Sequence, residues 1–264
     1  MSVLDAILRT KLDEVTLLRQ PGTREAIRKA ALAAGPTRDF AGGLRRDDGR
    51  LAVIAEIKRR SPSKGDLAPD LDPAVTAKAY ESGGAAALSV LTDGPFFGGT
   101  VADLQAASES TALPILRKDF VIDESQIWEA RAIGADAILL IVAAIPDDQL
   151  LRELQVLATE LELATLVEAH DADEVERALA AGARIVGVNC RNLGTFAEDL
   201  TTAERLRASI PADVIAVAES AIRSPDDARR MAGAGYDAIL VGEYLVRSAD
   251  PVATLHSLIE EEQH

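Results

Sequence analysis

Six polar residues suited to a catalytic site stand at or near the ends of short apolar runs. They are Glu56, Lys58, Lys118, Glu168, Asn189 and Glu219. An ammonium group can protonate a reacting oxygen and a carboxylate can accept a proton, so this set is suited to general acid–base catalysis. Any one of these residues could be an ordinary exposed charge where a strand meets a loop. Because such residues recur at five run ends of one chain, the set favours a functional site.

The spacing of Glu56 and Lys58 is that of two side chains on one face of a β-strand. If this face points inward, Glu56 lies about 6.6 Å deeper than Lys58, given the strand rise per residue. A buried carboxylate needs a positive partner, or its pKa rises. We therefore expect Lys58 or Lys118 to pair with Glu56.

The apolar runs that position these residues alternate with longer amphipathic segments. Eight runs occur, at residues 51–58, 86–91, 114–118, 137–142, 163–168, 185–189, 214–219 and 238–241. Continuous apolar strands that alternate with helices are typical of a parallel sheet covered by helices. Eight units, without a dinucleotide-binding glycine fingerprint after the first strand, predict an α/β fold of the (β/α)8 TIM-barrel type rather than an open sheet. Glycines that end helices in a left-handed conformation are expected at Gly84, Gly134, Gly182 and Gly235.

Residues 1–50 precede the eight units and have a different pattern. An amphipathic helix is predicted by apolar residues at near-helical spacing, namely Leu4, Ile7, Leu8, Val15 and Leu18. A second helix is expected over residues 24–34, and Gly42 and Gly43 are expected to loosen the chain before the first strand. We predict one domain over residues 1–264, in which this N-terminal helical extension caps the catalytic face of the barrel formed by residues 51–264.

Three segments contain groups suited to an anion. The basic loop at residues 59–65 favours contact with an anion over a plain solvated loop, because it stands out in an acidic chain. Barrel enzymes often bind phosphate after strands 7 and 8, where glycine allows close approach and free N–H groups point at the anion. We therefore predict a phosphate site formed by Ser220, Ala221, Gly242 and Glu243.

Composition narrows the class of protein. The 264 residues have a net charge of −15, which argues against nucleic acid as a partner, because its phosphates attract basic stripes. No segment resembles a membrane span or a secretory signal, and the single cysteine, Cys190, cannot form an internal disulfide, so a reducing cytoplasm is expected. The scattered histidines, His170, His256 and His264, lack metal-ligand spacing. We interpret Cys190 and Trp128 as packing residues and His170 as an ordinary loop histidine.

Specific motifs extend through nearly the whole chain. A Glu-x-Lys-x-x-Ser-Pro-Ser run spans residues 56–63, and a Leu-Arg-Lys-Asp-Phe run spans residues 116–120. Further matching segments are residues 4–7, 97–100, 139–142, 167–168, 188–193 and 218–220. With these motifs the chain resembles the indole-3-glycerol-phosphate synthases of tryptophan biosynthesis.

The resemblance implies a carbon–carbon lyase that needs no metal or other cofactor. The substrate would be 1-(2-carboxyphenylamino)-1-deoxyribulose 5-phosphate, whose ring carbon bearing the carboxylate attacks the ribulose carbonyl. Carbon dioxide and then water leave, which gives indole-3-glycerol phosphate. We expect this small anionic phosphosugar as the partner, with no nucleic acid and no membrane, and a monomer that can contact other tryptophan-pathway enzymes.

The resemblance also implies roles for the site residues. Lys118 would be the general acid at the carbonyl oxygen, Lys58 would hold the substrate carboxylate, and Glu168 would move protons during dehydration. The remaining polar residues would orient the lysines (Glu56), bind sugar hydroxyls and the anilino nitrogen (Asn189, Glu219) and support the carboxylate region or a closing loop (Arg191). The aromatic slot would be lined by Phe97, Phe120, Leu139 and Leu193. From the position of the loops, we also expect Ser61 or Lys58 near the phosphate.

Two positions depart from the family pattern. Ala221 stands where the family usually has glycine, and alanine disfavours a positive φ. Glu243 stands where some relatives have serine, so its carboxylate must turn away from the phosphate.

Two alternatives remain for the chemistry. An aldolase-like barrel could form a Schiff base on Lys118, although the Ser61-Pro62-Ser63 loop and the N-terminal helix argue against it. A non-catalytic anion-binding barrel would not need both proton donors and carboxylates. Because Glu56 and Glu168 lie near it, we expect Lys118 to stay protonated, as an acid catalyst must and a Schiff-base amine must not.

Overall fold

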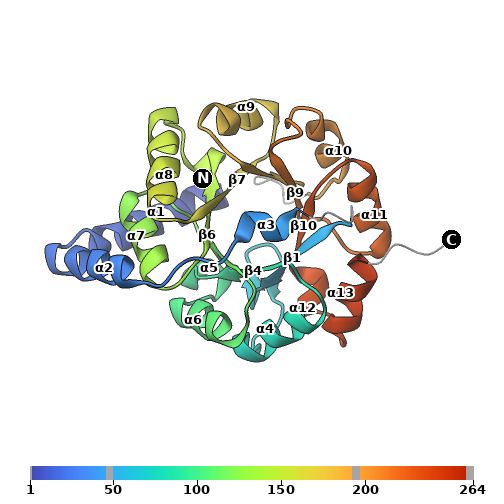
Figure 1. Ribbon diagram of the computed structural model, residues 1–264, viewed down its shortest axis with the longest axis horizontal. Coiled ribbons are helices and arrows are strands. Elements are labelled where there is room, and N and C mark those ends of the chain that lie inside the picture. Colours follow the sequence, from blue (N-terminus) through green and yellow to red (C-terminus); the bar gives the residue numbers. More distant parts are fainter. Residues whose placement is uncertain (1, 46–49, 192–196, 260–264) are drawn as a thin grey trace.

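A closed barrel of eight parallel strands forms the centre of the molecule (Figure 1). The computed structural model describes residues 2–45, 50–191 and 197–259. Around the barrel the strands follow the order β1-β10-β9-β8-β7-β6-β5-β4. They are β1 (Ala52–Ile57), β4 (Ala87–Leu91), β5 (Ile115–Lys118), β6 (Ala137–Ile141), β7 (Ala164–Ala169), β8 (Ile185–Asn189), β9 (Ile215–Glu219) and β10 (Ala238–Val241). Each predicted run is a barrel strand, so the predicted TIM barrel is confirmed.

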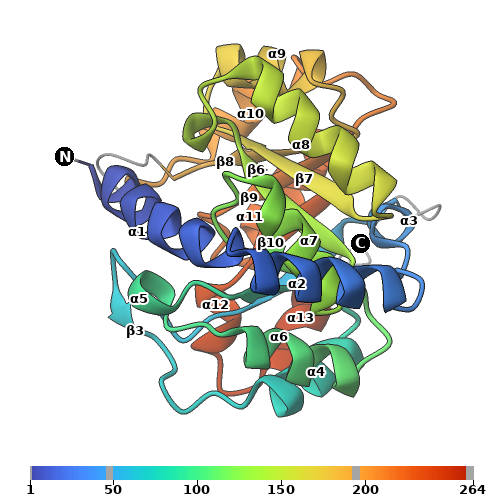
Figure 2. The same ribbon diagram turned by 90° about the vertical axis from the view of Figure 1, so that its left-hand side faces the viewer.

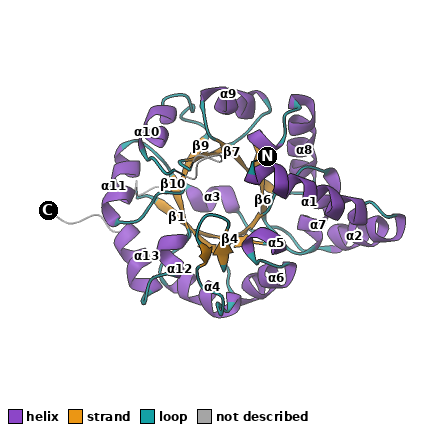
Figure 3. Cartoon of the chain, turned by 180° about the vertical axis from the view of Figure 1, so that it is seen from behind, coloured by secondary structure: helices purple, strands orange, loops and turns teal. Residues whose placement is uncertain are grey.

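Helices follow the strands and surround the barrel (Figure 3). The longer ones are α4 (Pro73–Ser82), α6 (Val101–Ser110), α7 (Glu124–Ala132), α8 (Asp148–Glu160), α9 (Ala172–Ala180), α10 (Thr201–Arg207), α11 (Pro225–Gly233) and α13 (Pro251–Ile259). Short elements in the loops are β2 (Arg60–Ser61), β3 (Gly65–Asp66), α5 (Gly94–Phe97), η1 (Val142–Ala144) and α12 (Glu243–Val246). Among the described helices, none is both long enough and apolar enough to cross a membrane.

Local sequence signals fix where the helices begin and end. Side chains that accept a backbone N–H cap the first turns of α4, α6, α7, α8, α9 and α11, from Asp72, Thr100, Asp123, Asp147, Asp171 and Ser224. The four glycines predicted to end helices all have positive φ, between 82° and 97°: Gly84, Gly134, Gly182 and Gly235. The helix-ending prediction is therefore confirmed.

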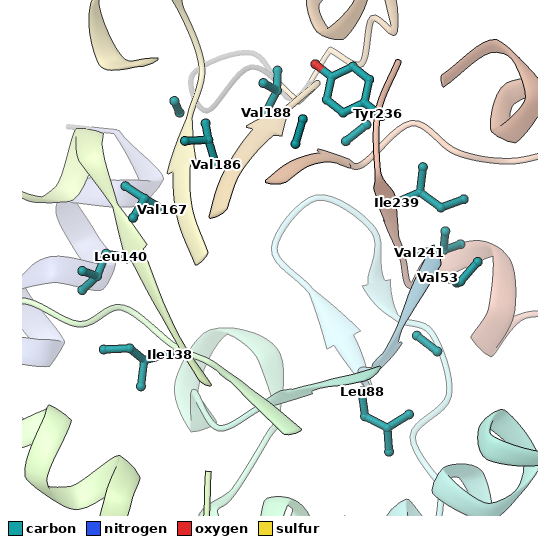
Figure 4. Packing of buried hydrophobic residues seen from close by; sticks show 14 of the residues in the cluster. Val53, Leu88, Ile138, Leu140, Val167, Val186, Val188, Tyr236, Ile239 and Val241 are labelled. Carbon is teal, nitrogen blue, oxygen red and sulfur yellow. The ribbon is translucent and has the colours of Figure 1, made fainter. Parts of the chain in front are cut away.

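Strand alternation divides the core into an outer and an inner layer. The outer layer lies between strands and helices, and Figure 4 shows Val53, Leu88 and Ile239 pointing away from the barrel centre. The inner layer fills the barrel and contains Ile54, two residues before Glu56 on the same strand. Glu56 therefore points into the barrel.

The N-terminal extension reaches both ends of the barrel, as Figure 2 shows. It consists of α1 (Val3–Leu18), α2 (Pro21–Ala33) and α3 (Phe40–Leu44). The expectation that Gly42 and Gly43 loosen the chain is wrong, because both lie inside α3. Phe40 and Leu44 are 1% and 0% exposed and pack into the inner layer. Thus α3 closes the end of the barrel opposite α1.

Candidate active site

A pocket lies at the carboxyl ends of the strands, and α1 contributes Val3, Leu4 and Ile7 to its wall. Of the sixteen predicted site residues, fifteen line this pocket; the sixteenth, Leu193, lies outside the described residues. The fifteen are Glu56, Lys58, Ser61, Phe97, Lys118, Phe120, Leu139, Glu168, Asn189, Arg191, Glu219, Ser220, Ala221, Gly242 and Glu243. The barrel therefore gathers side chains that are up to 187 residues apart, from Glu56 to Glu243.

Lys118, at the end of β5, lies between two glutamates. Its Nζ is 2.6 Å from Glu219 Oε2 and 3.1 Å from Glu168 Oε2. Burial alone would lower the pKa of Lys118, but Glu219, Glu168 and Glu56 outweigh burial and raise it. The ammonium form therefore prevails at neutral pH, which is the direction expected of an acid catalyst.

The two glutamates differ in their protonation. Burial raises the pKa of Glu219, and the charge of Glu168 adds to this rise, although Lys118 opposes it. Burial would also raise the pKa of Glu168, but Lys118 and His170 outweigh it and hold this pKa below its ordinary value. Of the two carboxyl groups, Glu219 is therefore the one that binds a proton more readily. A β-carbon at Gly187 would collide with Glu219 Oε1, so glycine makes room for this carboxyl group.

Glu56 and Lys58 form the expected ion pair on the inward face of β1. Glu56 is only 4% exposed, so Lys58 supplies the positive partner that burial requires. Gly242 approaches this pair closely, because a β-carbon there would collide with Glu56 Oε1 and lie 3.0 Å from Lys58 Nζ. A side chain at position 242 would therefore displace the ends of Glu56 and Lys58.

The loop after β9 has an unusual backbone. Ser220 and Ala221 have φ of 66° and 64°, in the left-handed region that favours glycine. Alanine at position 221, where the family usually has glycine, therefore places backbone strain beside the pocket. The other departure from the family pattern, Glu243, has its carboxylate 3.3 Å from the Nε of Arg247, the residue that caps the end of α12.

The apolar wall of the pocket is built around two phenylalanines. The rings of Phe97 and Phe120 have centroids 6.0 Å apart and are inclined by 37°. Asp93 fixes the first ring's backbone, since its Oδ1 accepts the N–H of Phe96 at 2.9 Å and of Phe97 at 3.2 Å. This wall is flat and apolar enough to face an aromatic ring.

The basic loop after β1 does not direct its arginines at the pocket. Arg59 binds Asp103, and Arg60 Nε is 3.7 Å from Asp66 Oδ1. The two arginines thus have carboxylate partners within the protein, and the expectation that donors of the loop meet an anion stays a prediction that rests on its other residues. The pocket wall is formed instead by the following residues of the loop, and Ser61 Oγ is buried there without a hydrogen bond from the described residues.

Lys11 is a buried charge that the sequence pattern did not reveal. It is 1% exposed, and its Nζ lies 2.8 Å from Asp119 Oδ1, 2.9 Å from Glu14 Oε2 and 3.0 Å from Asp93 Oδ2. Lys11 thus connects α1 to Asp119, the residue after Lys118, and to Asp93, which caps the short helix that contains Phe97. The available signal was its position midway between Ile7 and Val15, on the buried stripe of the helix.

His170 is not an ordinary loop histidine, so that interpretation is wrong. Its Nε2 lies 3.4 Å from Glu168 Oε1 and its Nδ1 2.9 Å from Glu174 Oε2. The signal was its position two residues after Glu168, on the same face.

Two other interpretations agree with the structure. Cys190 is buried in the outer core, and burial raises the pKa of its thiol to about 12. Trp128 packs against the core and beneath the guanidinium of Arg28, 5.0 Å from the ring centroid. Among the described residues, no group of three or more His, Cys, Asp or Glu could hold a metal ion.

Comparisons with known proteins extend over nearly the whole chain. The family model of indole-3-glycerol phosphate synthase matches residues 4–258. The indole-3-glycerol phosphate synthase of Nocardioides sp. (strain ATCC BAA-499 / JS614) is 51% identical over 253 residues, which are 95% of this chain and 95% of the relative. That of Arthrobacter sp. (strain FB24) is 48% identical over 254 residues, 95% of this chain and 93% of the relative.

A solved structure is similar in fold. The thiamine phosphate pyrophosphorylase from Pyrococcus furiosus has a TM-score of 0.59 at 18% identity. The match covers 79% of this chain and 93% of that one. At this identity the likeness extends to the barrel fold alone.

Proposed function

Because the chain belongs to the indole-3-glycerol phosphate synthase family, we propose that the pocket is its active site and that Lys118 is the general acid. The enzyme converts 1-(2-carboxyphenylamino)-1-deoxyribulose 5-phosphate into indole-3-glycerol phosphate, carbon dioxide and water, in tryptophan biosynthesis. The observation that supports the acid role is the Lys118 ammonium, held 2.6 Å and 3.1 Å from two buried carboxyl groups.

The stoichiometry of the reaction explains why a proton donor and a proton store are needed together. A substrate carboxylate leaves as neutral carbon dioxide while the carbonyl oxygen leaves as water, so each turnover consumes one proton. Lys118 protonates the carbonyl oxygen as the ring carbon forms the new carbon–carbon bond. Loss of carbon dioxide returns the bonding electrons to the ring and restores its aromaticity.

Dehydration then uses the two glutamates differently. Glu219, the protonated member of the pair, reprotonates Lys118, which gives its proton to the departing hydroxyl group. Glu168, the ionised member, takes a proton from the carbon beside the anilino nitrogen and completes the indole ring. Glu168 passes this proton to Lys118, and Glu219 regains one from solvent.

The remaining residues bind the two anionic ends of the substrate. Lys58 holds the carboxylate, Glu56 orients Lys58, and Arg191, which donates to Ser63 Oγ at 2.6 Å, supports this region. The phosphate lies against the N–H groups of Ser220, Ala221, Gly242 and Glu243, with Ser61 nearby. The aromatic ring lies along Phe97, Phe120 and Leu139, while Asn189 binds sugar hydroxyls. A crystal with phosphate bound after strands β4 and β5 instead would contradict this arrangement.

The test of the acid role is the fluorescence of the indole product. Lys118→Ala should lower kcat by about 10²–10⁴-fold, the usual contribution of general acid catalysis. Lys29→Ala, an exposed lysine of α2, is the matched control. Borohydride reduction with substrate present should leave the protein mass unchanged. A covalent adduct on Lys118 would show a Schiff base and refute the acid role.

We also propose that residues 1–264 form one domain whose N-terminal extension caps the catalytic face. The position of Leu4 in the pocket wall supports this. Leu4→Ala should raise the KM for substrate, whereas Leu12→Ala, on the same helix and 58% exposed, should leave it unchanged. Equal KM values for the two variants would contradict the capping role.

The setting of the enzyme is a further part of the proposal. We infer a monomer in the cytoplasm, where the buried thiol of Cys190 stays reduced. Light scattering of the purified protein tests the first statement, and fractionation of the source cells tests the second.

A further inference from the structure

We propose that His170 is a positioning residue that makes Glu168, and not Glu219, the ionised carboxylate beside Lys118. This inference rests on the proposed function, because it assigns the base of the same acid–base group. The sequence motifs imply different roles for the two glutamates but do not say which of them is ionised, so the charge state must come from their surroundings.

Lys118 by itself would favour the opposite assignment. Glu219 Oε2 is the nearer oxygen, 2.6 Å from Nζ against 3.1 Å for Glu168 Oε2. The two glutamates are buried to a similar degree, at 1% and 3% exposure. With equal burial and one shared cation, the nearer carboxylate would be the more stable anion.

A second cation reverses this preference. His170 Nε2 lies 3.4 Å from Glu168 Oε1, on the side of the carboxylate that faces away from Lys118. This contact is an ion pair, since among the described residues His170 Nε2 makes no hydrogen bond; Glu219 Oε1 also receives none, and the ion pair of Glu219 with Lys118 is formed by its other oxygen, Oε2. Glu168 therefore has a positive neighbour at each oxygen, and Glu219 has one at a single oxygen.

His170 is itself held in its charged form. Its Nδ1 lies 2.9 Å from Glu174 Oε2 on α9, and its backbone N–H donates to the same oxygen at 2.8 Å. The charged groups that face the ring are Glu168 on β7 and Glu174 on α9, with Lys118 on β5 and Glu219 on β9 beyond Glu168. Burial alone would lower the pKa of His170, but Glu168 and Glu174 raise it to about 10. The imidazolium therefore persists through the neutral range.

The kinetic test is the pH profile of the full-length enzyme. In His170→Asn the pKa of Glu168 should rise, so the acid limb of kcat/KM should move upward by about one pH unit. Because the pKa of Glu168 starts below its ordinary value, kcat/KM should fall by about 10-fold on this acid limb and change little at pH 7. Glu174→Gln should shift the limb in the same direction by less. His256→Asn, the same change at an exposed histidine of α13, should leave the profile unchanged.

Two kinetic outcomes would overturn the proposal. One is a His170→Asn profile that superimposes on that of the unsubstituted enzyme. The other is an equal loss at every pH, which would show a structural role without any effect on the charge of Glu168.

A second measurement does not depend on activity. NMR of histidine-labelled protein should show the His170 ring, assigned by its loss in His170→Asn, still protonated at about pH 8. A His170 ring that titrates near the ordinary value of about 6.5 would overturn the proposal. Failure of the proposed function would look different, since the unsubstituted protein would then yield no indole fluorescence while the NMR result stood.

Discussion

Replacing Lys11 with methionine should destabilise the protein and distort the pocket together. Methionine has nearly the length of lysine but no charge, so the change removes the cation without opening a large cavity. Lys11 Nζ faces Asp119, Asp93 and Glu14 at 2.8 to 3.0 Å and is shielded from water. Glu14 is half-exposed and can be solvated, so the loss falls on the two buried aspartates.

The expected loss of unfolding free energy is about 3 kcal/mol. Removing one partner of a buried ion pair costs about 3–5 kcal/mol, because the other charge is left uncompensated. Asp119 keeps Arg117 Nη2 at 3.1 Å and Thr92 Oγ1 at 2.6 Å, which places the estimate at the lower end of this range. Asp93 Oδ2 keeps no hydrogen bond from the described residues. The melting temperature should fall by about 6–12 °C.

Urea unfolding and steady-state kinetics test this reasoning. The KM for substrate should rise more than kcat falls, because Asp93 holds the backbone of Phe97 in the apolar wall. Lys29→Met, at an exposed site on α2, is the matched control. The double variant Lys11→Met/Asp93→Asn should regain much of the stability, since it also removes the carboxylate charge of Asp93 that Lys11→Met leaves buried and unpaired. A loss below about 1 kcal/mol in Lys11→Met, or no recovery in the double variant, would refute this account.

Three other outcomes follow from the geometry. Gly187→Ala should force the Glu219 carboxyl group away from Lys118 and lower kcat by about 10²-fold, whereas Gly233→Ala, with open space around it, should leave kcat unchanged. Ala221→Gly should relieve the strain at φ 64° and raise the unfolding free energy by up to about 1 kcal/mol; a loss of stability in urea would contradict the strain. Burial alone would raise the pKa of Asp119, but Arg117 and Lys11 lower it from 3.8 to about 2. The resulting stabilisation, about 2 kcal/mol, is complete above pH 4 and disappears as the pH falls towards 2, so Asp119→Asn should flatten acid unfolding curves in that interval.

The barrel and most of its pocket could be predicted because their signals are local. Each strand is a continuous apolar run, and each site residue stands at the carboxyl end of such a run, where barrel geometry brings the ends together. The pairing of Glu56 with Lys58 follows from alternation along a single strand. No knowledge of distant partners is needed for any of these inferences.

Two of the missed features depend on partners far away in the sequence. Lys11 looks like a surface charge of an amphipathic helix until Asp119, which is 108 residues later, is placed beside it. Arg59 looks ready for a ligand until Asp103 is seen to occupy its guanidinium group. His170 was missed for a different reason: its partners Glu168 and Glu174 are only two and four residues away, but no motif pairs them with a histidine. Charge type is visible in a sequence, but the identity of the neutralising partner is set by tertiary packing.

The extension that reaches both ends of the barrel has a consequence for the order of assembly during synthesis. The first helix leaves the ribosome first, yet Lys11 cannot lose its hydration shell until Asp93 and Asp119 have been made and folded. The linker before α3 likewise cannot adopt its final position until Asp136 has been made, because the N–H of Arg38 donates to this residue, 98 positions later. A nascent chain therefore builds the first three barrel strands, β1, β4 and β5, before α1 can complete the pocket wall. Until the strands have formed, the charged and polar residues of α1 and α2 keep the N-terminal extension hydrated.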